Sequence, residues 1–278
     1  VVPDGPLHAM PFAAIGHSSR ASDSRIWLDQ FSIVYSPSLA YAIASKDLNA
    51  SAPRNLVAVV ADPVYAIDDS RLGRQVSASK RSLLTLRSAD STPFVRLPSS
   101  AVEAAQVARY FNPERVVGLS GFDASAARVA KLPFERLAVL HFATHAVARS
   151  DSPSLSALFL SEFALNGDAL PKGSLTSLDV RRMGMRADLV VLSACSSGNG
   201  ERVRGEGVLG LTHSFLANGS GAVIAALWPV EDASTAQFMA EFYRSYSELH
   251  SPADALRQAQ LTFRSLASAQ SKDVWASF

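Results

Sequence analysis

Two short apolar runs of this chain each end beside a side chain that can take part in acid–base or nucleophilic chemistry. Residues 137–143 are followed by His145, and residues 188–194 are followed by Cys195, the single cysteine of the chain. A cysteine is nucleophilic as its thiolate, and a neighbouring histidine can take the thiol proton. The two runs therefore predict a cysteine nucleophile with a histidine base.

The elements that must position these two residues follow from the alternation of apolar and amphipathic segments. Strands are predicted at residues 55–61, 116–119, 137–143, 157–160, 188–194 and 222–228. Helices are predicted at residues 100–111, 124–132, 207–217, 233–249 and 252–268. This order predicts an α/β fold with a mainly parallel sheet covered by helices on both faces. Functional groups of such sheets lie just beyond the carboxyl ends of the strands, where His145 and Cys195 fall.

The first part of the chain is less regular. Residues 31–35 predict a strand, which a proline-containing turn separates from a helix at residues 39–44. Residues 66–96 are polar and basic, which favours a solvated insertion loop over a site for an acidic partner. This segment marks the predicted boundary between a first part, residues 1–96, and a second part, residues 97–278.

Ser100 and Glu103 have the spacing of a capping box, in which two side chains satisfy the first amides of a helix. We therefore expect them to open the helix predicted at residues 100–111.

Composition excludes several classes of protein. The chain has 278 residues, 48% of them hydrophobic and 18% charged, which predicts a folded protein rather than a disordered one. A net charge of +1 does not favour nucleic-acid binding. A single cysteine and the lack of a long apolar run predict a cytoplasmic protein that does not enter a membrane. The chain begins with Val1 and reads as a fragment of a longer one.

Each reactive residue also has a plainer interpretation. Cys195 can be a buried packing residue, and His145 can be a core histidine. His141 precedes His145 by four residues, but a strand does not bring such a pair to one metal ion as a helix does, so no metal site is predicted. The run from Gly205 to Gly210 fits a dinucleotide fingerprint, yet about ten residues separate it from the preceding strand, which argues against nucleotide binding or an oxidoreductase.

Trp228, Glu231 and Asp232 follow the last predicted strand, at the same end of the sheet as His145 and Cys195. An acidic residue there can bind a basic side chain of a substrate through charge-assisted hydrogen bonds. Asp232 can equally cap the helix that begins next to it. The residues alone leave both interpretations open.

Taken together, these stretches resemble the CHAT family, whose caspase-like domains are related to separase and are often joined to tetratricopeptide repeats in bacteria. The resemblance covers most of the chain and is strongest in four segments, residues 140–145, 189–195, 205–211 and 226–232. The 50 positions from His145 to Cys195 also fit the spacing typical of caspases.

The resemblance implies a caspase-like α/β/α sandwich, in which a degenerate half at residues 1–96 packs on a catalytic half at residues 97–278. It implies a cysteine endopeptidase without a cofactor, with Cys195 as nucleophile and His145 as general base. The amides of Ala146 and Cys195 would form the oxyanion hole. Asp232, with Glu231 and Trp228 beside it, would bind a basic residue before the cleaved bond.

Two departures from the family pattern concern the site. Ala146 stands where the family usually has glycine, and Ser196 with Ser197 replaces an acidic residue and threonine after the cysteine. The expected partners are a protein or peptide substrate and a regulatory protein or tetratricopeptide-repeat segment. The alternative function is a catalytically silent caspase-like module that binds other proteins.

Overall fold

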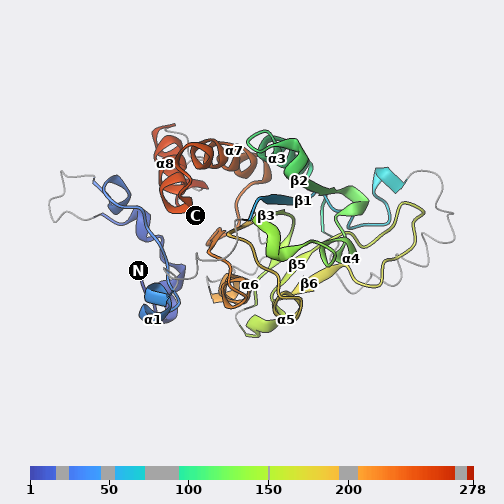
Figure 1. The fold of residues 1–278 in the computed structure, drawn as a ribbon, viewed down its shortest axis with the longest axis horizontal. Helices are drawn as coiled ribbons and strands as arrows, with labels where there is room; N and C mark the ends of the chain where they lie inside the picture. Colours follow the sequence, from blue (N-terminus) through green and yellow to red (C-terminus); the bar gives the residue numbers. More distant parts are fainter. Residues whose placement is uncertain (17–24, 45–53, 73–93, 150, 194–205, 267–273) are drawn as a thin grey trace.

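The computed structural model describes residues 1–16, 25–44, 54–72, 94–149, 151–193, 206–266 and 274–278. Its centre is a parallel sheet of five described strands in the order β2-β1-β3-β7-β8 (Figure 1). These strands are β1 (Leu56–Ala61), β2 (Val116–Ser120), β3 (Leu137–Ala143), β7 (Leu189–Leu192) and β8 (Ala222–Ala225). The predicted mixed α/β fold with a mainly parallel sheet is therefore confirmed.

Alternate side chains of the strands fill two separate cores. Val59, Val139 and Val191 face one core, whereas Val60 and Leu140 face the other. Because both faces of a parallel sheet are covered, its strands need the nearly continuous aliphatic sequence seen here. Each fully buried aliphatic side chain contributes about 1.5–3 kcal/mol of transfer free energy.

Helices cover both faces of this sheet (Figure 1). One face is packed by α3 (Pro98–Ala108), α7 (Asp232–Leu249) and α8 (Pro252–Ser265). The other face is packed by α4 (Ala126–Val129), α5 (Ser177–Arg182) and α6 (Glu206–Ala217). The arrangement is a three-layer sandwich of the caspase-like kind.

A second, antiparallel sheet lies beyond the carboxyl end of β3. It consists of β4 (Ala146–Val147), β5 (Ala157–Phe159) and β6 (Ser174–Thr176) in that order. The sequence predicted β5 but neither β4 nor β6, since both are too short to show a periodic pattern. This small sheet holds the chain immediately after His145.

The N-terminal arm, described at residues 1–16 and 25–44, forms short helices joined by irregular segments. It contains η1 (Gly5–Ala9), η2 (Phe12–Ala14), η3 (Trp27–Asp29) and α1 (Leu39–Ala44). The helix expected at residues 39–44 is confirmed. The strand expected at residues 31–35 is wrong, because these residues pair with no described strand and run irregularly along the molecule.

Polar contacts tie the N-terminal arm to α8, more than 200 residues later in the chain. Arg257 donates from Nε to the carbonyl of Leu28 at 2.8 Å and from Nη2 to that of Asp29 at 2.7 Å. Arg264 pairs with the carboxylate of Asp29, and Ser32 donates to Asp254 at 2.6 Å. The arm thus belongs to the same body as the C-terminal helices.

The capping box expected at Ser100 and Glu103 is wrong. Helix α3 begins two residues earlier, at Pro98, whose missing N–H suits the first turn of a helix. Glu103 is 2% exposed, and its Oε1 lies 2.9 Å from Nε2 of His141 on β3. The Glu103 carboxylate contacts a core residue and does not cap the helix. The local sequence does not distinguish a capping glutamate from a buried one.

The remaining described elements are short 3₁₀ helices in the connections. They are η5 (Ser70–Leu72), η6 (Pro113–Arg115), η7 (Gly121–Asp123), η8 (Phe134–Arg136) and η9 (Pro153–Leu155). Strand β1 precedes the predicted boundary at residue 96, whereas β2 and β3 follow it. In the sheet, β1 lies between β2 and β3. The division into two halves stays a prediction. None of the described helices is long and apolar enough to cross a bilayer.

Candidate active site

His145 is held by its main chain on both sides. It lies two residues after β3 and is 2% exposed. Its N–H donates to the hydroxyl of Tyr65 at 3.0 Å, and its carbonyl accepts from the N–H of Phe159 on β5 at 2.8 Å. These contacts fix the position of the residue at the carboxyl end of the sheet, as the sequence predicted.

The imidazole ring of His145 is oriented by residues 94 and 95. Its Nε2 lies 2.6 Å from the main-chain oxygen of Val95, and the ring of Phe94 stacks on it at 4.8 Å between centroids. A carbonyl oxygen only accepts hydrogen bonds, so Nε2 carries the proton and the lone pair of the neutral ring lies on Nδ1. The contact therefore selects the tautomer in which Nδ1 can act as a base.

Burial and charge act in opposite directions on His145. Burial lowers the pKa of the ring below its usual value, while the Val95 carbonyl and the negative charge of Asp232 oppose that shift. The net effect keeps the imidazole neutral over more of the acidic range. A neutral ring is the form that can accept a proton from a thiol.

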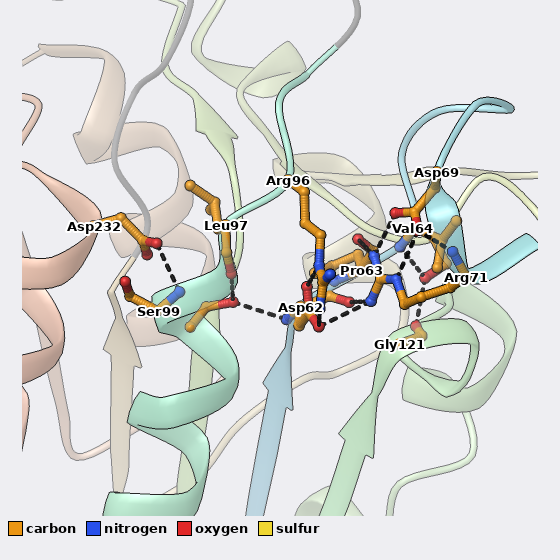
Figure 2. A network of polar contacts seen from close by, with 12 residues as sticks. Asp62, Pro63, Val64, Asp69, Arg71, Arg96, Leu97, Ser99, Gly121 and Asp232 are labelled. Carbon is orange, nitrogen blue, oxygen red and sulfur yellow. Dashed lines mark hydrogen bonds and ion pairs between the residues drawn. The ribbon is translucent and has the colours of Figure 1, made fainter.

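Asp62 lies at the end of β1 and binds two arginines (Figure 2). Arg96 reaches it with two contacts, Nε to Oδ1 at 2.9 Å and Nη2 to Oδ2 at 2.8 Å. Arg71 lies 2.9 Å from Oδ2 and also donates to the Asp62 carbonyl at 2.8 Å. Asp62 is 4% exposed and adopts a left-handed backbone with φ of 49°. Its charge is fully engaged within the protein.

Asp232 is the first residue of α7, but it caps a different helix. Its Oδ2 accepts from the N–H of Ser99 in the first turn of α3 at 2.9 Å (Figure 2). The carboxylate lies near enough to His145 for its charge to act on the ring. The capping alternative therefore holds for α3 rather than α7, and the role of Asp232 in substrate binding stays a prediction.

The other residues predicted beside Asp232 lie in the same connection between β8 and α7. Glu231 is exposed and accepts from the hydroxyl of Ser234 at 2.7 Å. Trp228 is half-buried. Their roles in substrate binding stay predictions.

Ala146, the predicted oxyanion donor, follows His145 as the first residue of β4. It pairs with Leu158 in the antiparallel ladder, while the neighbouring residue His145 accepts from Phe159. Hydrogen-bonded and non-bonded pairs alternate in such a ladder, so the Ala146 N–H points away from β5. Its φ is not positive, so alanine in place of glycine brings no backbone strain here.

Cys195 lies outside the described residues, as do Ser196 and Ser197. The described chain reaches Ser193, which directly follows β7 and is 6% exposed. Phe142 of β3 pairs with Leu192 of β7, so both strands end at the same edge of the sheet.

His141 lies in the core of the protein. It is completely buried between the Glu103 carboxylate and the hydroxyl of Tyr243, which lies 3.0 Å from its Nδ1. The described residues contain no group of three or more side chains that could hold a metal ion.

The glycines of the dinucleotide-like run have a packing role where the structure describes them. Gly205 lies outside the described residues, and Gly207 and Gly210 lie within α6. A Cβ on Gly210 would come within 2.3 Å of the carbonyl oxygen of Pro153 in η9. This glycine permits close packing of α6 on η9.

A cavity of about 390 Å³ lies between the N-terminal arm and the β8 edge of the sheet. Tyr35 and Tyr41 line it from the arm, and His213 and Leu216 line it from α6. None of the predicted site residues that the structure describes lines this cavity, and His145 is not among its lining residues.

Sequence reasoning missed the residues that contact His145, namely Tyr65, Phe94 and Val95, and the ion pair of Asp62 and Arg96 next to Val95. The single available signal was the position of Asp62 directly after a buried strand. The others lie in the polar segment of residues 66–96, or border it, and a main-chain carbonyl leaves no trace in a sequence.

Comparison with known proteins adds a family and two relatives. The family model described as the CHAT domain matches residues 1–278, the whole chain. The chain is 35% identical over 104 residues to tetratricopeptide repeat protein 28 of Mus musculus, and 34% identical over 104 residues to the human protein of that name. Each alignment covers 37% of this chain but only 4% of the relative.

Proposed function

Because the chain belongs to the CHAT domain family of caspase-like proteins, we propose that it is a cysteine endopeptidase with His145 as general base and Cys195 as nucleophile. The observation that carries this proposal is the contact between Nε2 of His145 and the Val95 carbonyl. It orients a buried histidine at the carboxyl end of the sheet and leaves the lone pair on Nδ1.

The position of Cys195 in the sequence supports the same pair. Leu192 of β7 pairs with Phe142 of β3, and Cys195 follows Leu192 by three residues in the sequence. Adjacent strands are about 4.8 Å apart, so β3 and β7 end side by side. We therefore propose that the Cys195 thiol lies within reach of the His145 ring.

The proposed reaction proceeds in two stages. Nδ1 of His145 takes the thiol proton, the sulfur of Cys195 attacks the peptide carbonyl, and the amine leaves with the proton from His145. Water then attacks the thioester with His145 again as base, which releases the acid and restores the thiol. The N–H groups of Ala146 and Cys195 stabilise the oxyanion, for which the outward direction of the Ala146 N–H is suitable.

We propose that the substrate is cut after a basic residue. Two arginines neutralise Asp62, whereas Asp232 lies beside the His145 environment with a cap to Ser99 as its described hydrogen bond. A carboxylate in that place attracts an arginine or lysine side chain. Glu231 and Trp228 lie in the same connection and would form the wall of this pocket.

Regulation would come from a partner. The two mammalian relatives are named as tetratricopeptide repeat proteins, and this chain spans a small part of their length. We propose that a regulatory protein or a tetratricopeptide-repeat segment controls access of substrate to the site.

Intact-mass labelling with a peptidyl acyloxymethyl ketone that ends in arginine tests the proposal. Wild type is expected to gain one adduct, and Cys195→Ala and His145→Ala are expected to gain none. Asp232→Asn keeps an acceptor for the Ser99 N–H and removes only the negative charge. If Asp232 binds the basic residue of the substrate, this variant should no longer be labelled faster by a probe that ends in arginine than by one that ends in aspartate. Such a loss would show that Asp232 has a role in substrate binding besides capping α3.

Wild-type protein that is not labelled even together with its regulatory segment or partner would contradict the peptidase. That result would favour the alternative, a catalytically silent caspase-like module that binds other proteins.

A further inference from the structure

Residues 94–96 form a short strap across His145, and each of the three residues has its own anchor. Phe94 packs between His145 and Phe159, with ring centroids 4.8 Å and 4.3 Å away. Val95 presents its carbonyl to Nε2 of the histidine, while its side chain is 78% exposed. Arg96 makes the two-point contact with Asp62. The position of the carbonyl therefore depends on what holds both ends of the strap.

The far end of the strap is attached to a rigid part of the molecule. Asp62 directly follows β1, which pairs with β3 along its whole length. Its N–H donates to Ser100 Oγ at 3.0 Å, and that hydroxyl donates to the Leu97 carbonyl at 2.6 Å. Arg71 contacts the same carboxylate, at Oδ2. Figure 2 shows Asp62 between the two arginines, with Leu97 beside it.

We propose that Asp62 and Arg96 are positioning residues for His145, and that their ion pair holds the Val95 carbonyl on Nε2 and so fixes the ring tautomer. The two-point contact between a guanidinium and a carboxylate restricts direction as well as distance. Arg96 is adjacent to Val95, so this restriction passes directly to the peptide group that meets the imidazole. Among the described contacts of Asp62 and Arg96, none involves the His145 ring.

The inference deepens the proposed function and rests on it for its catalytic consequence, but the tautomer itself is independent of any peptidase activity. A neutral imidazole without a fixed acceptor exchanges its proton between the two nitrogens. Loss of the ion pair between Asp62 and Arg96 should therefore produce a mixture of tautomers, in which part of the protein has the proton on Nδ1 and lacks a base there.

The test is ¹⁵N NMR of the histidine rings at pH 8, with the His145 signals assigned from a His145→Gln sample. Wild type is expected to show a single tautomer protonated on Nε2. Arg96→Gln is expected to show a mixture, and Arg96→Lys, which restores the charge, a partial return to the single tautomer. Val95→Ala is the matched control, because it changes an exposed side chain and keeps the carbonyl.

Asp62→Asn tests the same ion pair by removing the charge of the carboxylate. Asparagine also adopts the left-handed backbone, so this variant is expected to fold, and it should give the same mixture as Arg96→Gln. A single Nε2-protonated tautomer in either folded variant would overturn the inference and leave the pair with a purely structural role.

Kinetics separate this inference from the proposed function. If wild type cleaves an arginine substrate, Arg96→Gln is expected to lower kcat on the order of 100-fold with little change in KM, because it misplaces a catalytic group. If wild type cleaves nothing while the tautomer still depends on Arg96, the peptidase proposal fails and the positioning role stands.

Discussion

At the scale of single residues, burial and nearby charges have opposite effects on the pKa of His145. Burial disfavours the imidazolium of His145, and the carboxylate of Asp232 favours it. Asp62 adds little net charge, since Arg71 and Arg96 pair with it. The protonation of His145 should therefore respond to Asp232 in particular.

Replacing Asp232 by asparagine is predicted to lower the pKa of His145 further. The negative charge of Asp232 raises that pKa, so its removal leaves burial less opposed, and the ring stays neutral to lower pH. NMR titration of the His145 ring measures the shift. Glu231→Gln is the control, because it removes a neighbouring exposed charge, and it should leave the titration unchanged. A rise in pKa for Asp232→Asn would contradict the prediction.

At the scale of elements, two close contacts hold layers of the sandwich together. One is the approach of α6 to η9 at Gly210, where no side chain fits. The other is the buried contact of Glu103, His141 and Tyr243, which joins α3, β3 and α7. One is a close packing contact and the other is fully buried, so small changes should have measurable effects on stability.

Gly210→Ala is predicted to destabilise the fold by about 1–3 kcal/mol, because a Cβ there would overlap the Pro153 carbonyl and force the elements apart. Unfolding in urea, followed by circular dichroism, gives the free energy. Gly118→Ala is the matched control, since a Cβ at Gly118 on β2 meets nothing within 4 Å. Equal stability of the two variants would show that α6 can move without cost.

Tyr243→Phe is predicted to cost about 1–3 kcal/mol of unfolding free energy, because it leaves Nδ1 of the buried His141 without its hydroxyl partner. Tyr246→Phe is the control, as Tyr246 packs beside Tyr243 on α7 but is only half-buried. Urea titrations of both variants test the difference. A Tyr243→Phe protein as stable as wild type would argue against the hydrogen bond.

At the scale of the whole molecule, the N-terminal arm and α8 form one unit although they lie at opposite ends of the chain (Figure 1). Helix α8 packs on α7, and α7 in turn packs on α3. The first residues of the protein are thus connected through three helices to the face of the sheet that carries His141.

Loss of the Arg257 side chain is predicted to loosen the arm without unfolding the sheet. Arg257→Ala removes both contacts to the carbonyls of Leu28 and Asp29, so amide exchange should quicken at residues 27–35 and stay slow in β1 and β3. Hydrogen–deuterium exchange with mass spectrometry detects this. Arg244→Ala is the control, because its ion pairs lie within α7. Unchanged exchange in the arm would show that apolar packing alone holds it.

Strong periodic segments made most of the fold predictable from sequence. The predicted limits of β3 were confirmed to the residue, and α6, α7 and α8 lie close to their predicted positions. Apart from α1, the arm was not predictable, and neither were β4 and β6 of the short sheet around Ala146, because long-range contacts rather than local patterns determine them. For the site, the sequence identified His145 by its place after a strand, while its orienting partners act through a carbonyl and an ion pair distant in sequence.

The backbone conformation at Asp62 restricts which amino acids can replace it. The position needs a residue that tolerates φ of 49° and that also carries a negative charge close to the main chain. Glycine and asparagine meet the first requirement but not the second, and glutamate carries the charge on a longer side chain that favours other backbone angles. A library of all twenty amino acids at this position, selected only for folding, should therefore retain asparagine and glycine with aspartate. Selection for activity that depends on a correctly oriented His145 should retain aspartate alone.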